Sequence, residues 1–268
     1  MSRLRDLLAE GRVVRLDGGL STALEELGAD LDDPLWTARA LRDTPELVLA
    51  AHRAFVDAGA EIVIAASYQA PQDLLAKSIE VARAAGVLVA GSIGPYGAVL
   101  GGGQEYTGDY DVPNGWHERR LRELTAADCI AIETQPRADE AAGIVRALED
   151  LDGPDAWVTF TCRDDKTTHH GDRIEDAVRA VASPKVVAVG VNCTAPAYVD
   201  ALLERITAVT DLPLVAYPNA GRTYDPATKT WSGETSACTF KGATIVGGCC
   251  GWGPREIAAL HATRRPRA

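Results

Sequence analysis

The sequence predicts an α/β fold, a (β/α)8 TIM barrel that forms one domain over residues 1-268. Two observations predict it: eight short apolar runs rich in valine and isoleucine, and a helical pattern between most of them. Continuously apolar runs are typical of strands that are buried on both faces of a parallel sheet. A doubly wound open sheet is the alternative, but site residues at many strand ends fit a closed barrel better.

Each predicted strand ends beside a glycine or a polar or thiol-bearing residue, which marks where the chain leaves the sheet. The strands are expected at Val13–Leu16, Glu61–Ala66, Val87–Gly91, Cys129–Glu133, Ala156–Thr161, Val186–Val191, Leu214–Tyr217 and Ala243–Val246.

Helices are expected around these strands. Thr44 gives the clearest start signal, because it precedes a proline at the first helical position. Leu4, Leu7 and Leu8 indicate a short helix before the first strand. Further helices are expected at Leu74–Ala85, Trp116–Ala127, Asp139–Leu151, Ile174–Ala182, Ala197–Val209 and Pro254–His261.

The composition limits the partners of the chain. Its formal net charge is -11, which argues against a nucleic-acid backbone or an anionic membrane as partner. No apolar run approaches the roughly 18 residues of a membrane span, and the N-terminus lacks a signal-peptide pattern. We therefore expect a cytoplasmic protein, a monomer or small homo-oligomer, that acts on small molecules.

Six cysteines in a chain of this length do not suggest a secreted disulfide scaffold. Cys249 and Cys250 end the eighth predicted strand within Gly-Gly-Cys-Cys-Gly, and Cys193 follows the sixth. Three thiols at two strand ends can converge on one soft metal. Three thiolates suit Zn2+ and leave a fourth position open, as a catalytic zinc requires. The remaining cysteines, Cys129, Cys162 and Cys238, are expected only to pack or to be exposed.

Several spaced motifs together resemble the homocysteine S-methyltransferase family. They are Asp17–Gly19, Ala66–Ala70, Gly91–Gly97, Ile132–Thr134, Gly190–Cys193, Tyr217–Gly221 and Gly247–Gly251. The resemblance runs through nearly the whole chain and is strongest to the branch that uses S-methylmethionine. It implies a zinc-dependent barrel in which Cys193, Cys249 and Cys250 hold the metal and the homocysteine thiol completes the site. The implied reaction moves a methyl group from a sulfonium donor to that thiol, giving methionine. S-Adenosylmethionine is the alternative donor.

The resemblance also implies which residues bind the substrates. Asp17 and Glu133 would hold the ammonium group of homocysteine. Gly18 and Gly19 would let backbone amides approach its carboxylate. The remaining residues expected to line the site are Ser67, Tyr68, Asn192 and Asn219.

A cationic donor needs groups that stabilise positive charge, and aromatic faces do so. Tyr68, Tyr96 and Tyr106 lie in loops after the second and third predicted strands. The glycine-rich segment 101–110 is placed to act as a lid over the donor. His169 and His170 are adjacent in a polar loop, and we expect both at the surface.

The chain departs from the family pattern at two kinds of position. The connecting helices after the second and third strands look short, and Gly221–Gly242 contains no convincing helix. Trp252 follows the cysteines where a small or polar residue is usual. A bulky ring there could obstruct the open metal position, so the alternative function is a zinc-binding barrel without methyltransferase activity.

Overall fold

The computed structural model describes residues 2–33, 35–221, 223–225, 230–232 and 238–263. Eight parallel strands form one sheet in the order β1-β10-β7-β6-β5-β4-β3-β2, and a parallel bridge between Leu16 and Ile62 joins its two ends. The predicted (β/α)8 barrel is therefore confirmed, with every predicted strand present. The strands are β1 (Val14–Arg15), β2 (Ile62–Ile64), β3 (Leu88–Ile93), β4 (Cys129–Gln135), β5 (Ala156–Phe160), β6 (Val186–Asn192), β7 (Leu214–Tyr217) and β10 (Ala243–Val246).

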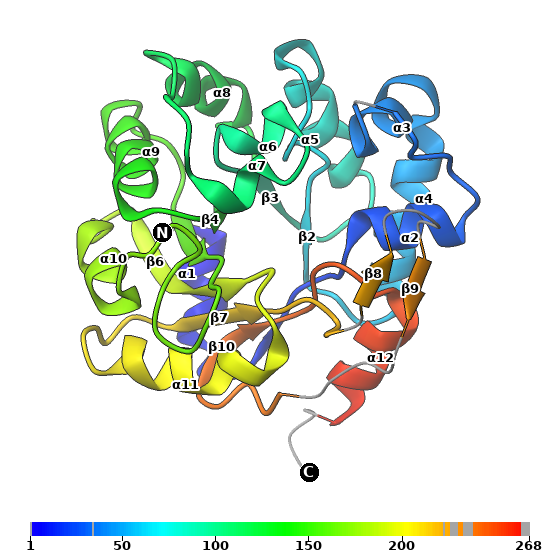
Figure 1. The fold of residues 1–268 in the computed structure, drawn as a ribbon. Coiled ribbons are helices and arrows are strands. Elements are labelled where there is room, and N and C mark those ends of the chain that lie inside the picture. Colours follow the sequence, from blue (N-terminus) through cyan, green and yellow to red (C-terminus); the bar gives the residue numbers. More distant parts are fainter. Residues whose placement is uncertain (1, 34, 222, 226–229, 233–237, 264–268) are drawn as a thin grey trace.

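Helices surround the barrel on its outside (Figure 1). Those that match predicted helices are α1 (Arg3–Ala9), α4 (Pro45–Asp57), α5 (Leu75–Arg83), α8 (Trp116–Leu124), α9 (Ala138–Asp150), α10 (Ile174–Ala180), α11 (Pro196–Thr207) and α12 (Pro254–Thr263). Pro45 opens α4 as predicted, but the Thr44 hydroxyl donates to the Ala40 carbonyl oxygen instead of capping the helix.

Two apolar layers hold the barrel together. The larger layer lies between the strands and the surrounding helices. The smaller layer fills the barrel interior and includes Trp157, Tyr217 and Ile245 from three different strands. Leu4 of α1 is fully buried in this inner layer, and Leu7 packs against it, so α1 contributes to the barrel interior. Burying a leucine side chain is worth about 1.5–3 kcal/mol, so this short helix contributes to the stability of the interior.

Some elements differ from the sequence prediction. Strands β3, β4 and β6 run one or two residues further than expected, because neighbouring strands continue to pair with them. Four short helices near the ends of β1 and β3 were not predicted, because they are too short to show periodicity: α2 (Leu20–Glu26), α3 (Thr37–Asp43), α6 (Gly97–Leu100) and α7 (Gln104–Thr107). A 3-10 turn, η1 (Gln72–Leu74), precedes α5.

The stretch between β7 and β10 has no helix among its described residues, as expected. An antiparallel hairpin lies there instead, formed by β8 (Thr223–Asp225) and β9 (Thr230–Ser232). Part of this stretch, 233–237, lies outside the described residues, and residues 238–241 are not helical.

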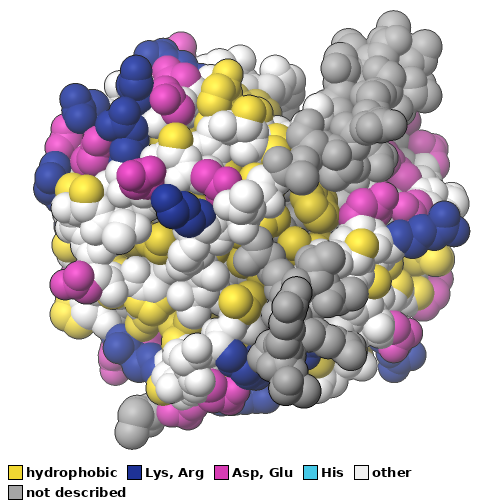
Figure 2. Space-filling model, turned by 90° about the horizontal axis from the view of Figure 1, so that it is seen from below, with side chains coloured by type: hydrophobic (Ala, Val, Ile, Leu, Met, Phe, Trp, Pro, Cys, Tyr) yellow, Lys and Arg dark blue, Asp and Glu magenta, His cyan; other side chains and the backbone are white. Residues whose placement is uncertain are grey.

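The outer surface mixes charges of both signs. Figure 2 shows one face of the molecule, where basic and acidic side chains are interspersed around the rim. Within the described residues, no helix combines the length and apolar character that a bilayer crossing needs.

His52 of α4 is fully buried in the helix-facing layer, and neither ring nitrogen has a hydrogen-bond partner among the described residues. Burial lowers the pKa of His52 to about 4. A buried imidazole without partners disfavours the charged form, because the cation would lose its hydration.

This buried imidazole predicts an acid-sensitive component of stability. Between about pH 6.5 and pH 4 the unfolded chain binds a proton at His52 and the folded chain does not, so stability is present above pH 6.5 and is lost as the pH falls. The loss should reach about 3 kcal/mol, at 1.36 kcal/mol per pKa unit. Urea unfolding at pH 7, 6 and 5 should show a smaller pH slope for His52→Leu than for wild type. Equal slopes would contradict the prediction, and exposed His170→Gln serves as the control.

Candidate active site

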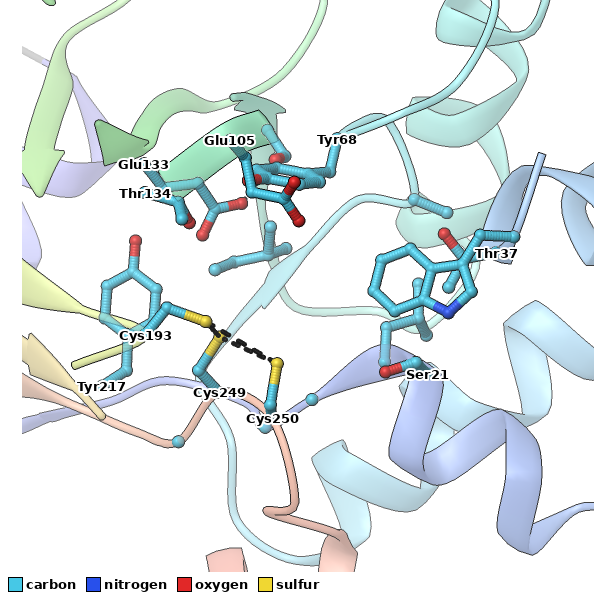
Figure 3. Close-up of a pocket in the computed structure, with 18 of the residues that line it drawn as sticks. Ser21, Thr37, Tyr68, Glu105, Glu133, Thr134, Cys193, Tyr217, Cys249 and Cys250 are labelled. Carbon is cyan, nitrogen blue, oxygen red and sulfur yellow. Dashed lines mark hydrogen bonds between the residues drawn. The ribbon is translucent and has the colours of Figure 1, made fainter. Parts of the chain in front are cut away.

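A cavity of about 220 Å³ opens at the carboxyl ends of the strands, the end where (β/α)8 enzymes place their active sites. Figure 3 shows the three cysteines close together, with Glu105, Tyr68 and Glu133 above them and Ser21 and Thr37 to one side. The cavity is lined by Gly18, Gly19, Leu20, Ser21, Trp36, Thr37, Ile64, Ala65, Ala66, Tyr68, Ser92, Glu105, Tyr106, Glu133, Thr134, Cys193, Tyr217, Gly248, Cys249 and Cys250.

The three predicted thiols meet at this cavity. Cys193 Sγ lies 2.9 Å from Cys249 Sγ and 3.6 Å from Cys250 Sγ, and the latter two are 4.0 Å apart. Bonds of about 2.3 Å from sulfur to a tetrahedral zinc place the sulfurs about 3.8 Å apart. Two of the three separations fit this value, and the shortest is still far longer than the roughly 2.05 Å of a disulfide. The donor set therefore fits a soft metal ion bound by three thiolates.

The thiols of the cluster shift one another's pKa values. Hydrogen bonds from Cys193 and Cys249 hold the pKa of the Cys250 thiol well below its ordinary value. Hydrogen bonds to Cys193 and Cys250 raise the pKa of Cys249. Of these two thiols, Cys250 therefore loses its proton first, and a bound cation would be needed to keep further thiolates charged together.

The cysteine pair is held by close backbone contacts with the tip of β1. The amide of Gly248 donates to the Asp17 carbonyl oxygen at 3.1 Å, and the amide of Gly19 donates to the Trp252 carbonyl oxygen at 2.9 Å. A Cβ atom at Gly19 would lie 2.6 Å from the Cys249 carbonyl oxygen, and one at Gly18 would lie 2.4 Å from that of Trp252. Only glycine permits this approach.

These contacts bear on the role expected for the two glycines that follow β1. Gly18 and Gly19 line the cavity, but the Gly19 amide is already bonded to Trp252, so it is not available to a substrate carboxylate. Both glycines have a packing role, and an approach of the Gly18 amide to a substrate carboxylate stays a prediction.

Cys193 adopts a backbone conformation that is rare for a side-chain-bearing residue, with φ of 47°. Its amide donates to the Tyr217 carbonyl oxygen, and its carbonyl oxygen accepts from the Thr161 hydroxyl. Thr134 has a similar φ of 56° directly after Glu133. Such conformations cost about 1–3 kcal/mol each and persist where the surroundings enforce them.

Asn192 enforces the conformation of Thr134. Its side-chain oxygen accepts from the Thr134 amide at 2.7 Å, and its side-chain nitrogen donates to the Thr134 hydroxyl at 2.8 Å. Asn192 is fully buried and does not line the cavity. It thus braces the wall that carries Glu133, which differs from the direct contact that the sequence suggested.

Glu133 is the buried acid that the sequence placed at the site, and it lines the cavity near Cys193 (Figure 3). Its carboxylate accepts a short hydrogen bond from the Ser92 hydroxyl and interacts with the Tyr217 hydroxyl. Burial raises the pKa of Glu133 to about 7, although both of these hydrogen bonds act to lower it. The group therefore changes charge within the neutral range.

Asp17, the second predicted acid, lies just behind the cavity wall. Its Oδ2 accepts from the Ile64 amide at 2.8 Å, while its buried Oδ1 has no partner among the described residues. Burial raises the pKa of Asp17 well above its ordinary value, and the nearby Glu133 acts in the same direction. An orphaned carboxylate oxygen beside a second acid is the arrangement that a cationic group would satisfy.

Two further predicted residues do not line the cavity. Ser67 is buried and exchanges hydrogen bonds with the backbone of Ser92. Asn219 accepts from the Gly221 amide and so closes a local turn. Both are structural supports of the strand ends, a role that sequence spacing does not distinguish from substrate contact.

Tyr68 and Tyr106 line the cavity as predicted, whereas Tyr96 does not. Tyr96 instead packs its ring edge against Tyr110 and Trp116. His169 is half-buried, contrary to expectation, and its ring contacts that of Tyr106 at a centroid distance of 5.2 Å. His170 is exposed, as expected.

The predicted lid segment 101–110 contains α7, which brings Glu105 and Tyr106 over the thiols. Glu140 of α9 anchors the chain on either side of it. This carboxylate accepts from the Tyr96 amide at 2.6 Å, from the Tyr110 hydroxyl at 2.9 Å, and contacts His117 Nε2 at 2.9 Å. The side chain of Glu140 is only 1% exposed, so its bonds tie the lid firmly to the barrel.

Several lining residues were missed by sequence reasoning, among them Ser21, Trp36, Thr37, Glu105 and Tyr217. Most lie in or beside the short helices α2, α3 and α7, whose boundaries the sequence pattern did not show. Tyr217 was predicted only as the end of a strand, and Glu105 only as part of the lid.

Trp252 does not obstruct the thiols. It is buried in the helix-facing apolar layer, with its ring 6.4 Å from that of Phe240, and it does not line the cavity. The remaining cysteines behave as expected: Cys129 and Cys162 are buried, and Cys238 is half-buried outside the cluster.

Comparisons with known proteins agree with this geometry. A model of the family described as homocysteine S-methyltransferase matches residues 14–264. The chain is 39% identical to homocysteine S-methyltransferase 2 of Zea mays over 307 aligned positions, covering 95% of this chain and 90% of that protein. It is 37% identical to homocysteine S-methyltransferase of Escherichia coli over 302 positions, covering 97% of each.

The crystal structure of the metallated form of the Escherichia coli homocysteine methyltransferase is similar over 97% of this chain and 99% of that one. The TM-score is 0.85 at 36% identity. Both sequence alignments are longer than the 268 residues of this chain, so the relatives carry segments that it lacks. This agrees with the shortened connections between the strands.

The thiol cluster predicts one bound metal ion per chain. Replacing Cys193, Cys249 or Cys250 by serine removes one soft ligand and should lower the metal content of purified protein to a small fraction of wild type. Elemental mass spectrometry measures the ratio. Cys238→Ser is the matched control and should keep its metal. Full metal content in all three cluster variants would rule out the assigned ligands.

Proposed function

This chain belongs to the homocysteine S-methyltransferase family, and we propose that it transfers a methyl group from S-methylmethionine to the thiol of homocysteine, giving methionine. The observation that carries the proposal is the meeting of three cysteine thiols, within 4.8 Å of one another, at a cavity that Glu133 also lines. The earlier alternative of an inactive barrel is not favoured, because the tryptophan that suggested it faces the apolar core.

We propose Zn2+ as the metal, held by Cys193, Cys249 and Cys250. Soft thiolate ligands favour zinc among the common ions, and three of them leave one position for a substrate sulfur. When bound, zinc would supply the charge that keeps the homocysteine sulfur deprotonated at neutral pH, where a free thiol is mostly protonated.

The acids of the site suit the ammonium group of homocysteine. Glu133 offers a buried carboxylate inside the cavity, and Asp17 Oδ1 lies behind the wall without a described partner. An ammonium group here would favour the charged form of both carboxylates. Ser92 and Tyr217 hold the Glu133 carboxylate in place from two strands.

The proposed transfer is a single displacement. The homocysteine sulfur, having lost its proton, attacks the methyl carbon of the sulfonium donor. A new sulfur–carbon bond forms while the bond between that carbon and the donor sulfur breaks. The electron pair of the broken bond stays on the donor sulfur, which becomes a neutral thioether. With S-methylmethionine, both products are methionine. The buried walls contribute by aligning the two sulfurs and excluding water.

The size of the cavity supports a compact donor. Its volume of about 220 Å³ lies below the roughly 300–1,000 Å³ of pockets that hold drug-sized ligands. Two small amino acids suit this space better than a donor that carries an adenosine. S-Adenosylmethionine remains the second candidate donor.

The setting proposed for the enzyme follows from its thiols. The three cysteines of the cluster are free thiols, and they must stay reduced to bind a metal. We therefore propose a reducing, cytoplasmic location and one homocysteine-binding domain over residues 1-268.

The charge of Glu133 predicts how homocysteine binding depends on pH. Protonation below about pH 7 removes the carboxylate that would pair with the ammonium, so affinity should fall as the pH is lowered from 8 to 6. Glu133→Gln should bind homocysteine more weakly by about 1.5–3 kcal/mol at pH 8. Calorimetry of wild type and variant at each pH isolates this component, because effects on the thiol are shared. Unchanged affinity with intact metal content would exclude this role of Glu133.

The choice of donor gives a second prediction. S-Methylmethionine should support a higher kcat/KM than S-adenosylmethionine, because the small cavity would bind the transition state for the compact donor better. Methionine formation with homocysteine measures both values at matched enzyme concentration. Equal or faster turnover with S-adenosylmethionine would reverse the assignment.

A further inference from the structure

We propose that Glu105, together with the rings of Tyr68 and Tyr106, forms the subsite that binds the sulfonium group of the methyl donor. The inference rests on the proposed function and adds to it the residues that recognise the positive charge. The sequence already placed aromatic rings and a lid on this side of the cavity, and the structure adds a carboxylate to them.

Glu105 is a half-buried acid whose carboxylate has one oxygen, Oε2, shielded from solvent. It lies on α7 in the lid and lines the cavity, and its Oε2 atom has no hydrogen-bond partner among the described residues. Burial raises the pKa of Glu105, and Cys193 acts in the same direction. An acid taken out of water in this way is costly unless a cation offsets its charge.

The position of Glu105 places it near the reacting sulfurs. It lies close enough to Cys193, Cys250 and Tyr68 to interact electrostatically with each of them. Figure 3 shows its side chain and that of Tyr68 above the thiols, on the lid side of the cavity. A donor whose methyl group meets a sulfur held at the thiols would bring its own sulfur, and hence its positive charge, near this carboxylate.

Two aromatic rings complete the subsite. The Tyr106 hydroxyl lies 3.6 Å from Cys193 Sγ, and the ring of Tyr68 packs where a side chain at Gly94 would collide with it. His169 supports Tyr106 from behind. Aromatic faces attract cations, and cages of such rings recognise methylated cations. A carboxylate that lines the same cavity as two tyrosines therefore suits a methylated sulfonium.

The homocysteine acids lie elsewhere. Glu133 and Asp17 belong to the ends of β4 and β1, whereas Glu105 comes from the lid. The lid is in turn held by Glu140, which does not line the cavity. The two sets of acids thus come from separate elements and would serve two different cations.

The chemistry predicts how Glu105 contributes. The donor sulfur loses its positive charge as the methyl group leaves, so a carboxylate beside it stabilises the bound donor more than the transition state. It also favours the charged donor over the neutral thioether product, which helps product to leave. Removing the charge of Glu105 should therefore weaken donor binding strongly and change kcat little.

The test uses Glu105→Gln in metal-loaded enzyme, with exposed Glu123→Gln as the matched control. The KM for S-methylmethionine should rise about tenfold or more, with kcat changed less than about threefold and homocysteine affinity unchanged. Glu105→Asp, which keeps the charge, should recover part of the loss. Equal weakening of homocysteine binding would assign Glu105 to the acceptor and overturn the proposal, as would an unchanged donor KM.

A second donor separates sulfonium from ammonium recognition. N-acetyl-S-methylmethionine keeps the sulfonium but lacks the ammonium, so Glu105→Gln should weaken its binding as much as it weakens that of S-methylmethionine. Loss of the penalty with the acetylated compound would show that Glu105 holds the ammonium instead. Binding is followed by calorimetry without homocysteine. A wild type that binds S-methylmethionine but does not turn it over would refute the proposed function and leave the subsite testable.

Discussion

The site depends on the close backbone approach of the ends of β1 and β10, the first and last strands of the barrel, which pair with each other. Gly18 and Gly19 face the loop of the cysteine pair so closely that any side chain would collide with a carbonyl oxygen. The reciprocal bonds from Gly248 to Asp17 and from Gly19 to Trp252 fix this contact. One interaction thus sets the position of the thiols and, through Asp17, of an acid that faces the same region. This packing explains Gly18, Gly19 and Gly247, since a Cβ atom at Gly247 would lie 2.5 Å from the Asp17 carbonyl oxygen.

A second constraint is the concentration of negative groups in a small, buried volume. Burial raises the pKa of each of the three acids, Asp17, Glu105 and Glu133. In the free protein each of these carboxyl groups holds a proton more tightly than it would in water. The ammonium group of homocysteine and the sulfonium group of the donor would favour the charged carboxylates, so binding of the substrates would favour the release of protons from these acids. The free-energy cost of burying the charged acids is then offset only when both substrates are present. The site would therefore favour ligands that carry positive groups over neutral analogues.

The sequence predicted the barrel well because its strands are continuously apolar and buried on both faces, a signal that does not depend on distant contacts. The thiol cluster was predictable for the same reason, since its residues end recognisable strands. The remaining parts of the site were not. Asn192 and Ser67 are polar residues at strand ends, yet the structure uses them to brace Thr134 and Ser92. Trp36 and Glu105 belong to short elements whose place over the cavity is set by tertiary contacts, such as those of Glu140, and not by local pattern.

The three thiols come from two chain segments that are far apart in the sequence. Cys193 and Cys249 are separated by 56 positions, and β7 lies between their strands in the sheet. Before the barrel is assembled, the chain offers only the adjacent pair Cys249 and Cys250, which is one thiol short of the complete set. High-affinity capture of a metal ion must therefore follow the docking of β10 against β7. A bound ion would therefore indicate that the barrel is folded, and loss of the pairing between β10 and β7 would release the ion.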